Sequence, residues 1–303
     1  MGIYCKKPLS SSQNSQKIYQ LQTINEPDSD NQFHLITYDI NQEKIYISKI
    51  NFRIITSIKG LSQLNHENTI FLCGGLNKNE LSGSILIRIE TNNLNESKIH
   101  YLINSQFIHQ YPSMLYIGNC LIIIIGGKKQ IKCECFDYEY NKWSNLPDLP
   151  EERYHCSLCL DNSKNFIYLF GGFNKEINCN VEYILRLSID EQLKWEKIII
   201  KDSFSRNLIM KNSCSTFSVN NDIFILGGIN NFGKLCDDII KFDIKNNIVC
   251  KMSNTLEKKG KFYNQTGVCV NDIFYIFFDS NDFIHKVYKD DAFLFPNEST
   301  EVE

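Results

Sequence analysis

Alanine is nearly absent from this chain of 303 residues, with one copy at Ala292. Alanine is the best helix former, whereas isoleucine and the aromatic residues, which are common here, favour strands. The composition therefore disfavours an all-helical fold. The chain is long enough to bury a sizeable core, so it needs neither disulfides nor a metal to fold.

The chain also lacks an excess of charge of either sign. It has 32 lysines and arginines against 35 aspartates and glutamates, a formal net charge of −3. A general nucleic-acid-binding protein carries a strongly basic surface, so we expect no nucleic-acid partner.

No long hydrophobic run occurs. The N-terminus has no apolar stretch that could form the core of a signal peptide, and runs such as Cys120–Ile125 are far too short to span a bilayer. We therefore expect a cytoplasmic protein whose 12 cysteines stay reduced. Cys156 and Cys159 form a CxxC, but no second CxxC follows at zinc-ribbon spacing, so we expect no metal and no cofactor.

The extreme N-terminus leaves an alternative open. Removal of Met1 would expose Gly2 for N-myristoylation, and Cys5 would supply the palmitoylation site that stable anchoring needs. The match is imperfect, because Lys6 stands where the motif has serine or threonine. Membrane association through Gly2 and Cys5 thus stands beside a purely cytoplasmic location.

The most informative feature is a repeat, an apolar run that ends in two glycines. Glycine adopts positive φ freely and lacks a Cβ, so it suits a tight turn against neighbouring backbone. Successive pairs are separated by 52, 45 and 56 residues, a period near 50. The pairs are Gly74–Gly75, Gly126–Gly127, Gly171–Gly172 and Gly227–Gly228.

Each glycine pair has matching context on both sides. A short apolar strand and a polar turn precede it, and a third strand follows, which closes on an aromatic–aspartate pair in Phe136–Asp137 and Phe242–Asp243. A fourth strand follows that and twice carries a tryptophan, Trp143 and Trp195. Each unit therefore predicts four short strands joined by polar turns.

These glycine pairs, aromatic–aspartate pairs and tryptophans resemble the kelch repeat. The best single unit runs from Met114 to Arg153. The resemblance implies an all-β fold, a kelch-type β-propeller in which each repeat is one four-stranded blade. The aromatic residues are expected to fill the wedge between neighbouring blades.

The period also predicts a degenerate unit at each end of the four clear repeats. Lys17–Leu21, Phe33–Asp39 and Lys44–Ser48 would be strands of the first, and Val268–Phe278 and Phe283–Tyr288 of the last. We expect six blades, with five as the alternative if the end units merge, and Ala292–Phe295 as a strand that closes the ring.

The repeats leave no room for a second domain. We expect one propeller over residues 17–295, a flexible tail over residues 1–16, and a C-terminal tail over residues 296–303. No helical BTB-like module is expected beside the propeller.

Motifs of catalysis are missing, because the chain has no Gly-x-Ser-x-Gly, P-loop, HExxH or GxGxxG. Its six histidines are scattered without metal-ligand spacing. The propeller hosts binding modules and a few enzymes, so we expect a non-catalytic protein-interaction module, a scaffold or adaptor, and a monomer. The alternative is an oxidase or sugar-acid isomerase of the kelch-like type, the oxidase with a copper site and a tyrosine–cysteine crosslink.

The segments that lead into each innermost strand are the candidate binding surface, because loops carry function while strands carry packing. Tyrosine and arginine are enriched in binding hot spots. The candidate binding residues are therefore Tyr111, Arg153, Tyr154 and Tyr263. For Arg153 and its neighbour His155 we favour a structural role, in hydrogen bonds between blades.

Overall fold

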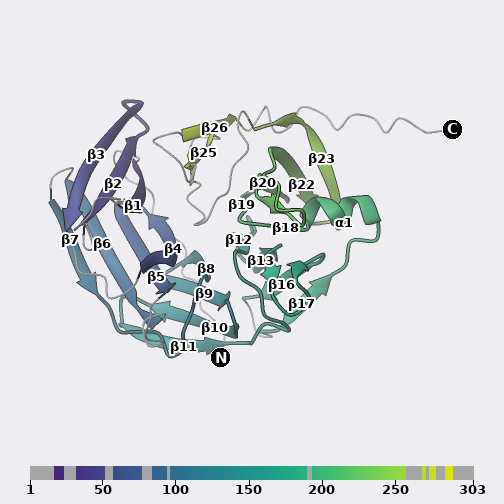
Figure 1. Cartoon of the computed structure of the whole chain (residues 1–303), viewed down its shortest axis with the longest axis horizontal. Helices are drawn as coiled ribbons and strands as arrows, with labels where there is room; N and C mark the ends of the chain where they lie inside the picture. Colours follow the sequence, from purple (N-terminus) through teal and green to yellow (C-terminus); the bar gives the residue numbers. More distant parts are fainter. Residues whose placement is uncertain are drawn as a thin grey trace. The chain divides into compact units, whose positions relative to one another are not determined.

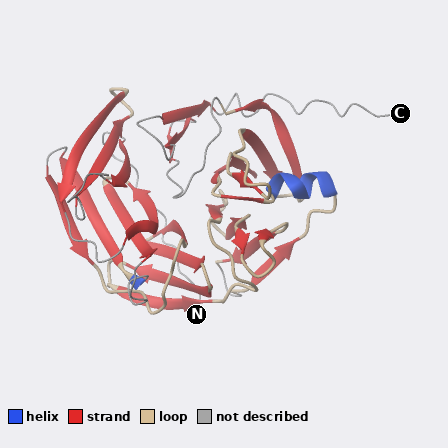
Figure 2. Ribbon diagram, in the orientation of Figure 1, coloured by secondary structure: helices blue, strands red, loops and turns tan. Residues whose placement is uncertain are grey.

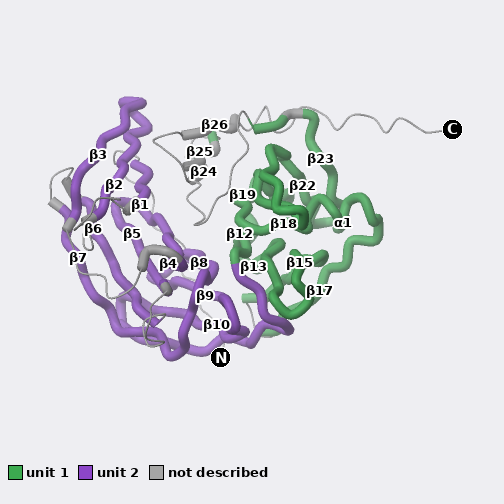
Figure 3. Tube along the Cα trace, in the orientation of Figure 1, with its two compact units in different colours: residues 1–2, 155–303 green, residues 3–154 purple. Residues whose placement is uncertain are grey.

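The computed structural model describes residues 17–23, 32–51, 57–76, 84–93, 96–189, 193–256, 268–270, 273–277 and 284–288. Strands make up most of them, with one α-helix, α1 (Ser203–Ile209) (Figure 2). The described residues fall into two compact units, one that ends at Tyr154 (unit 2) and one that begins at His155 (unit 1) (Figure 3). Within these ranges no helix combines the length and the apolar character that crossing a membrane requires.

Unit 2 contains three antiparallel sheets, each an up-and-down meander in chain order (Figure 1). The first has three strands and the next two have four. Their strands are β1 (Lys17–Thr23), β2 (Gln32–Asp39) and β3 (Lys44–Asn51); β4 (Ser57–His66), β5 (Thr69–Leu76), β6 (Leu86–Asn93) and β7 (Glu96–Tyr101); and β8 (Ser113–Gly118), β9 (Leu121–Gly127), β10 (Gln130–Asp137) and β11 (Lys142–Leu146).

Unit 1 repeats the plan with two four-stranded sheets and a three-stranded one. The unit also contains two short two-stranded antiparallel sheets, the hairpin of β14 (Phe173–Asn174) with β15 (Cys179–Asn180) and the pair of β18 (Lys211–Asn212) with β21 (Ile229–Asn230). The sheet strands are β12 (Ser157–Leu160), β13 (Phe166–Phe170), β16 (Ile184–Ser188) and β17 (Trp195–Ile198); β19 (Ser215–Val219), β20 (Asp222–Leu226), β22 (Asp238–Asp243) and β23 (Ile248–Thr255); and β24 (Val268–Val270), β25 (Ile273–Phe277) and β26 (Ile284–Tyr288).

These sheets correspond to the predicted repeats. The four clear repeats form the four-stranded sheets, and the two degenerate end units form three-stranded sheets within the described residues. If each of the two three-stranded end sheets is a blade of its own, the chain has six blades. If the two end sheets belong to one blade, it has five. The proposed closing strand, Ala292–Phe295, both predicted tails and Phe278 lie outside the described residues. The expectation of one domain over residues 17–295 stays a prediction.

The helix α1 was not predicted. It begins after Asp202, whose side chain accepts a hydrogen bond from the Ser205 amide at 2.6 Å, as an N-cap residue does. Helix α1 and the β14–β15 hairpin are insertions between Gly171 and Gly227, and they explain why that spacing is the longest of the three.

The hydrophobic core lies between neighbouring sheets, because each sheet is apolar on both faces. In unit 2 one cluster joins Phe71 of β5 to Ile122 of β9, Phe136 of β10 and Trp143 of β11. The Phe136 and Trp143 rings are 4.7 Å apart, centroid to centroid. In unit 1 Phe242 of β22 packs against the Tyr168 and Phe170 rings of β13. Where the structure describes them, the repeat aromatics thus fill the space between sheets, as predicted.

The aspartate of the aromatic–aspartate pair fixes the turn that follows the third strand. Asp137 Oδ1 accepts hydrogen bonds from the Glu139 and Tyr140 amides, both at 3.0 Å. Asp39 Oδ1 and Asp243 Oδ1 each accept hydrogen bonds from two amides of the turn that follows in their own repeat. Aspartate recurs here because its side chain satisfies turn amides that no strand reaches.

The glycine pairs lie against the backbone that leads into an innermost strand. A Cβ on Gly171 would lie 1.9 Å from the Lys211 carbonyl oxygen, and one on Gly127 would lie 2.8 Å from the Gln110 carbonyl oxygen. Both glycines also have positive φ, 56° and 134°. Hydrogen bonds cross the same contacts, from the Gly172 amide to the Lys211 oxygen at 2.9 Å and from the Lys128 amide to the Gln110 oxygen at 2.7 Å.

Gly171→Ala therefore tests the close approach. We expect it to lower the free energy of unfolding by about 3 kcal/mol or more, because it adds a backbone clash to the cost of a left-handed residue. Gly233→Ala is the matched control, since Gly233 has φ 70° and nothing within 4 Å of its Cβ position. It should cost about 1–2 kcal/mol. Urea denaturation measures both, and equal losses would contradict the proposed clash.

Candidate functional site

Three lead-in segments, residues 109–111, 153–155 and 211–213, precede the inner strands β8, β12 and β19. Their third residues, Tyr111, His155 and Ser213, share a left-handed backbone with φ of 55°, 55° and 54°. Two of these residues donate a backbone N–H hydrogen bond to a carbonyl oxygen at the matching position of the preceding repeat. Tyr111 N donates to Gly60 O at 2.9 Å, and Ser213 N to His155 O at 2.8 Å. Backbone hydrogen bonds therefore hold segment 109–111 to the preceding repeat and segment 211–213 to His155.

The first residue of each lead-in segment is a buried base paired with a carboxylate. His109 and Arg153 are 0% exposed and Lys211 is 3% exposed. Their partners are Glu134 at 2.9 Å, Glu151 at 2.9 Å and Asp238 at 2.6 Å. Buried charges need such pairing, so these residues anchor the segments from inside.

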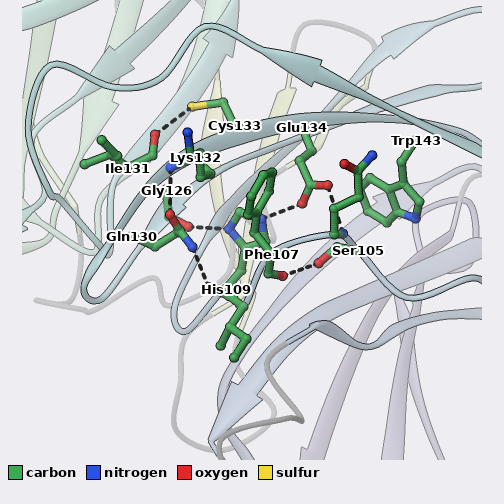
Figure 4. Close-up of polar contacts among 12 residues, drawn as sticks. Ser105, Phe107, His109, Gly126, Gln130, Ile131, Lys132, Cys133, Glu134 and Trp143 are labelled. Carbon is green, nitrogen blue, oxygen red and sulfur yellow. Dashed lines mark hydrogen bonds and ion pairs between the residues drawn. The ribbon is translucent and has the colours of Figure 1, made fainter.

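The His109 pair is the most enclosed of the three (Figure 4). His109 Nδ1 lies 2.6 Å from Gly126 O, and since a carbonyl only accepts, Nδ1 carries the hydrogen. Its Nε2 lies 2.9 Å from Glu134 Oε2, and Glu134 Oε1 accepts from the Gln106 amide at 3.0 Å. These hydrogen bonds link the lead-in segment, the glycine pair and β10.

The Lys211 pair has a second cation. Lys251 Nζ lies 2.5 Å from Asp238 Oδ1, whereas Lys211 Nζ donates to Asp238 Oδ2. Burial by itself raises the pKa of Asp238, but the hydrogen bonds from Lys211 and Lys251 outweigh it, and the net pKa is lowered. Asp238 therefore stays ionised between its two lysines.

The structure brings two of the predicted binding residues together. The Tyr111 and Tyr154 rings are 6.1 Å apart, centroid to centroid, with an interplanar angle of 34°. Both side chains are half-buried. The pKa of Tyr154 is raised, mainly by burial and further by the charges of Glu152 and Tyr111. The two lead-in segments thus present a tyrosine pair beside a carboxylate.

The other two predicted binding residues are placed differently. Arg153 is fully buried, and its Nη2 donates to Glu151 at 2.9 Å, a local bond within the same stretch of chain, so the favoured role in hydrogen bonds between blades stays a prediction. Tyr263 lies outside the described residues, as do Gly2 and Cys5. Binding at any of these positions stays a prediction.

Two carboxylates that pair with buried bases, Glu134 and Asp238, were not identified from the sequence. Glu134 lies between Cys133 and Cys135, and all three are buried in β10. An acidic residue inside a buried strand signals a paired charge. Asp238 gives no such signal, because it stands at the first position of its strand, directly after Asp237.

A second exposed surface in unit 1 lies at the turn after β21. Phe232 is 93% exposed on the turn after β21. Asn230 fixes that turn, because its Oδ1 accepts from the amides of Phe232 and Lys234, both at 3.0 Å. Asn231 Oδ1 accepts from the Asn180 amide at 2.7 Å and joins this turn to β15. Asn230 and Asn231 therefore have a structural role, because their side-chain oxygens accept hydrogen bonds from backbone amides.

The oxidase alternative can be compared with a tyrosine cluster in unit 2. Tyr138 has a raised pKa, mainly from burial and further from hydrogen bonds with Cys120 and Tyr116. The His66 ring stacks on Tyr116 with centroids 3.6 Å apart. The cluster holds one histidine, and among the described residues no three His, Cys, Asp or Glu side chains gather as metal ligands. The described residues thus give the oxidase alternative a tyrosine–cysteine neighbourhood with one histidine beside it.

Comparisons with known proteins bear on the repeats directly. A family model described as the KLHDC2/KLHL20/DRC7 Kelch-repeats domain matches residues 113–300, more than half of the chain. The Kelch repeat and BTB domain-containing protein 2 of cowpox virus (strain GRI-90 / Grishak) is 24% identical over 180 residues. That match covers 57% of this chain and 30% of the relative, so the chain spans under a third of that relative's length.

Substitution of Glu134 tests the buried pair. Glu134→Ala leaves His109 without its carboxyl partner, and we expect a loss of about 3–5 kcal/mol in the free energy of unfolding. Glu134→Gln should cost clearly less, because its amide still accepts from Gln106 and donates to His109 Nε2. Urea denaturation gives both values. A loss below about 1 kcal/mol for the alanine variant would show that the pair does not anchor the segment.

Proposed function

This chain belongs to the kelch-repeat family, and from that premise we propose that it is a non-catalytic scaffold or adaptor that binds a partner protein. The family's β-propeller fold places functional residues on loops and uses its strands for packing. The lead-in segments of unit 2 are the binding surface in this proposal.

The tyrosine pair is the observation that carries the proposal. Tyr111 and Tyr154 lie on different repeats, yet their rings are 6.1 Å apart. Their backbones are held in place, since the Tyr111 amide bonds to Gly60 and the adjacent Arg153 carbonyl accepts from the Gly127 amide at 3.2 Å. A rigid aromatic pair loses little conformational entropy on binding and buries a large area, which is what hot-spot residues do.

The relatives support an interaction role. The matching cowpox virus protein is named for its kelch repeats and a BTB domain, and this chain matches 30% of its length.

The variant Tyr111→Ala/Tyr154→Ala tests the binding surface. The tagged protein is isolated under mild conditions from cells that normally express it, and co-purifying chains are identified by mass spectrometry. We expect a stoichiometric partner with the wild type and at least a tenfold loss with the double variant, because alanine removes both aromatic anchors.

Tyr140→Ala is the matched control, since Tyr140 is 74% exposed on the β10–β11 turn of the same unit. It should retain the partner, and thermal unfolding checks that all variants fold. A wild-type protein that purifies alone, or a partner lost equally from all variants, would overturn the proposal.

We also propose that the protein acts in the cytoplasm, with Gly2 and Cys5 as its means of membrane attachment if both are acylated. The intact mass of protein from its native source distinguishes the two cases. Loss of Met1 with added acyl chains would establish a membrane-tethered scaffold. A mass without acyl chains would leave the cytoplasmic form alone.

A further inference from the structure

Glu152 has a buried carboxylate oxygen that accepts no hydrogen bond from the described residues. This atom, Oε1, has almost no solvent exposure. Its neighbour Glu151 differs, because its own Oε1 accepts from Arg153 at 2.9 Å. A shielded acceptor without a donor is costly, and the cost is larger for an ionised group. A donor that arrives with a ligand would remove that cost.

The tyrosine pair lies beside this carboxylate. Tyr154 follows Glu152 by two residues, and the charge of Glu152 contributes to the raised pKa of Tyr154, after burial. The Tyr111 ring lies 6.1 Å from the Tyr154 ring, tilted by 34°. A group over one ring would therefore be within reach of the second ring, and Glu152 stands two residues from Tyr154 in the same stretch of chain.

Aromatic faces and a carboxylate attract the same kind of ligand, a cation. A cation within about 6 Å of a tyrosine ring centroid is attracted by the negative face of the ring. A carboxylate adds an ion pair and a charge-assisted hydrogen bond. We propose that Tyr111, Glu152 and Tyr154 bind a positively charged side chain of the partner protein, the guanidinium of an arginine.

Arginine fits this site better than lysine does. Its planar guanidinium stacks on one ring while its N–H groups donate sideways to a carboxylate. A lysine ammonium is a more strongly hydrated point charge and loses more hydration at a half-buried site. This inference rests on the proposed function, because it names the chemistry that the partner brings to the same surface.

The direct test uses a small probe. The protein is labelled with 3-fluorotyrosine, and the resonances of Tyr111 and Tyr154 are assigned with the Tyr111→Phe and Tyr154→Phe variants. N-acetyl-arginine-N-methylamide is titrated against it, with the neutral citrulline analogue as the shape-matched control. We expect both resonances to shift saturably with the arginine probe alone, at a Kd on the order of 1–10 mM.

Glu152→Gln should weaken that binding at least about tenfold, because it keeps the shape of the side chain and removes its charge. Glu139→Gln is the matched control, since Glu139 is exposed in the same unit and its loss changes the net charge equally. Equal shifts with citrulline, equal affinity for a lysine probe, or an unchanged Kd in Glu152→Gln would each overturn the inference.

The failure of this inference can be told from failure of the proposed function. If Tyr111→Ala/Tyr154→Ala loses the partner while Glu152→Gln retains it and the arginine probe does not bind, the interaction surface stands and the arginine site is wrong. If the probe binds as expected but no partner co-purifies, the site stands and the scaffold proposal fails.

Discussion

The close approach between each glycine pair and a lead-in segment is the constraint on which the rest of the structure depends. A Cβ on Gly171 would lie closer to the Lys211 carbonyl oxygen than any two non-bonded atoms can approach. The Gly172 amide donates a hydrogen bond to that same oxygen. This contact places the end of one strand against the start of another, one repeat away. The apolar faces of neighbouring sheets can then close on each other and bury Phe136, Trp143 and Phe242.

The buried bases complete this arrangement. His109, Arg153 and Lys211 occupy equivalent places but differ in chemistry, and each finds a carboxylate from a different position in the chain. Each of these three repeats therefore has a buried base–carboxylate pair, but the residue types in the pair differ from repeat to repeat. Because the bases face inward, the second and third residues of the lead-in segments are free to differ between repeats, and in unit 2 they include Tyr111 and Tyr154. A rigid framework with variable residues at its edge is the arrangement that suits a recognition surface.

Much of the fold could be predicted from local patterns. The glycine pairs and the aromatic–aspartate pairs recur because each meets a requirement within its own repeat, a tight turn or a set of unsatisfied amides. The period then located the strands of both end sheets, including β1–β3, without any glycine pair. The helix α1 was missed because it is a seven-residue insertion outside the repeat, and its signal is little more than the N-cap residue Asp202.

The candidate site could be predicted only in part. Tyr111 and Tyr154 stood out by residue type and position, but their proximity depends on how consecutive repeats pack. The pairing of His109 with Glu134 joins residues 25 apart, and that of Lys211 with Asp238 joins residues 27 apart. No local pattern encodes such partners. Arg153 was a candidate by residue type, with a structural role favoured for it, and the fold buries it completely.

Native-state hydrogen exchange tests the central claim most directly, because it reports on single amides of the lead-in contacts. The account predicts that the amides of Tyr111, Lys128, Gly172 and Ser213, which bond across these contacts, exchange as slowly as those of strands β9 and β20. Exchange of these four amides as fast as that of the exposed Phe232 turn would contradict it, since the segments would then not be fixed by the framework.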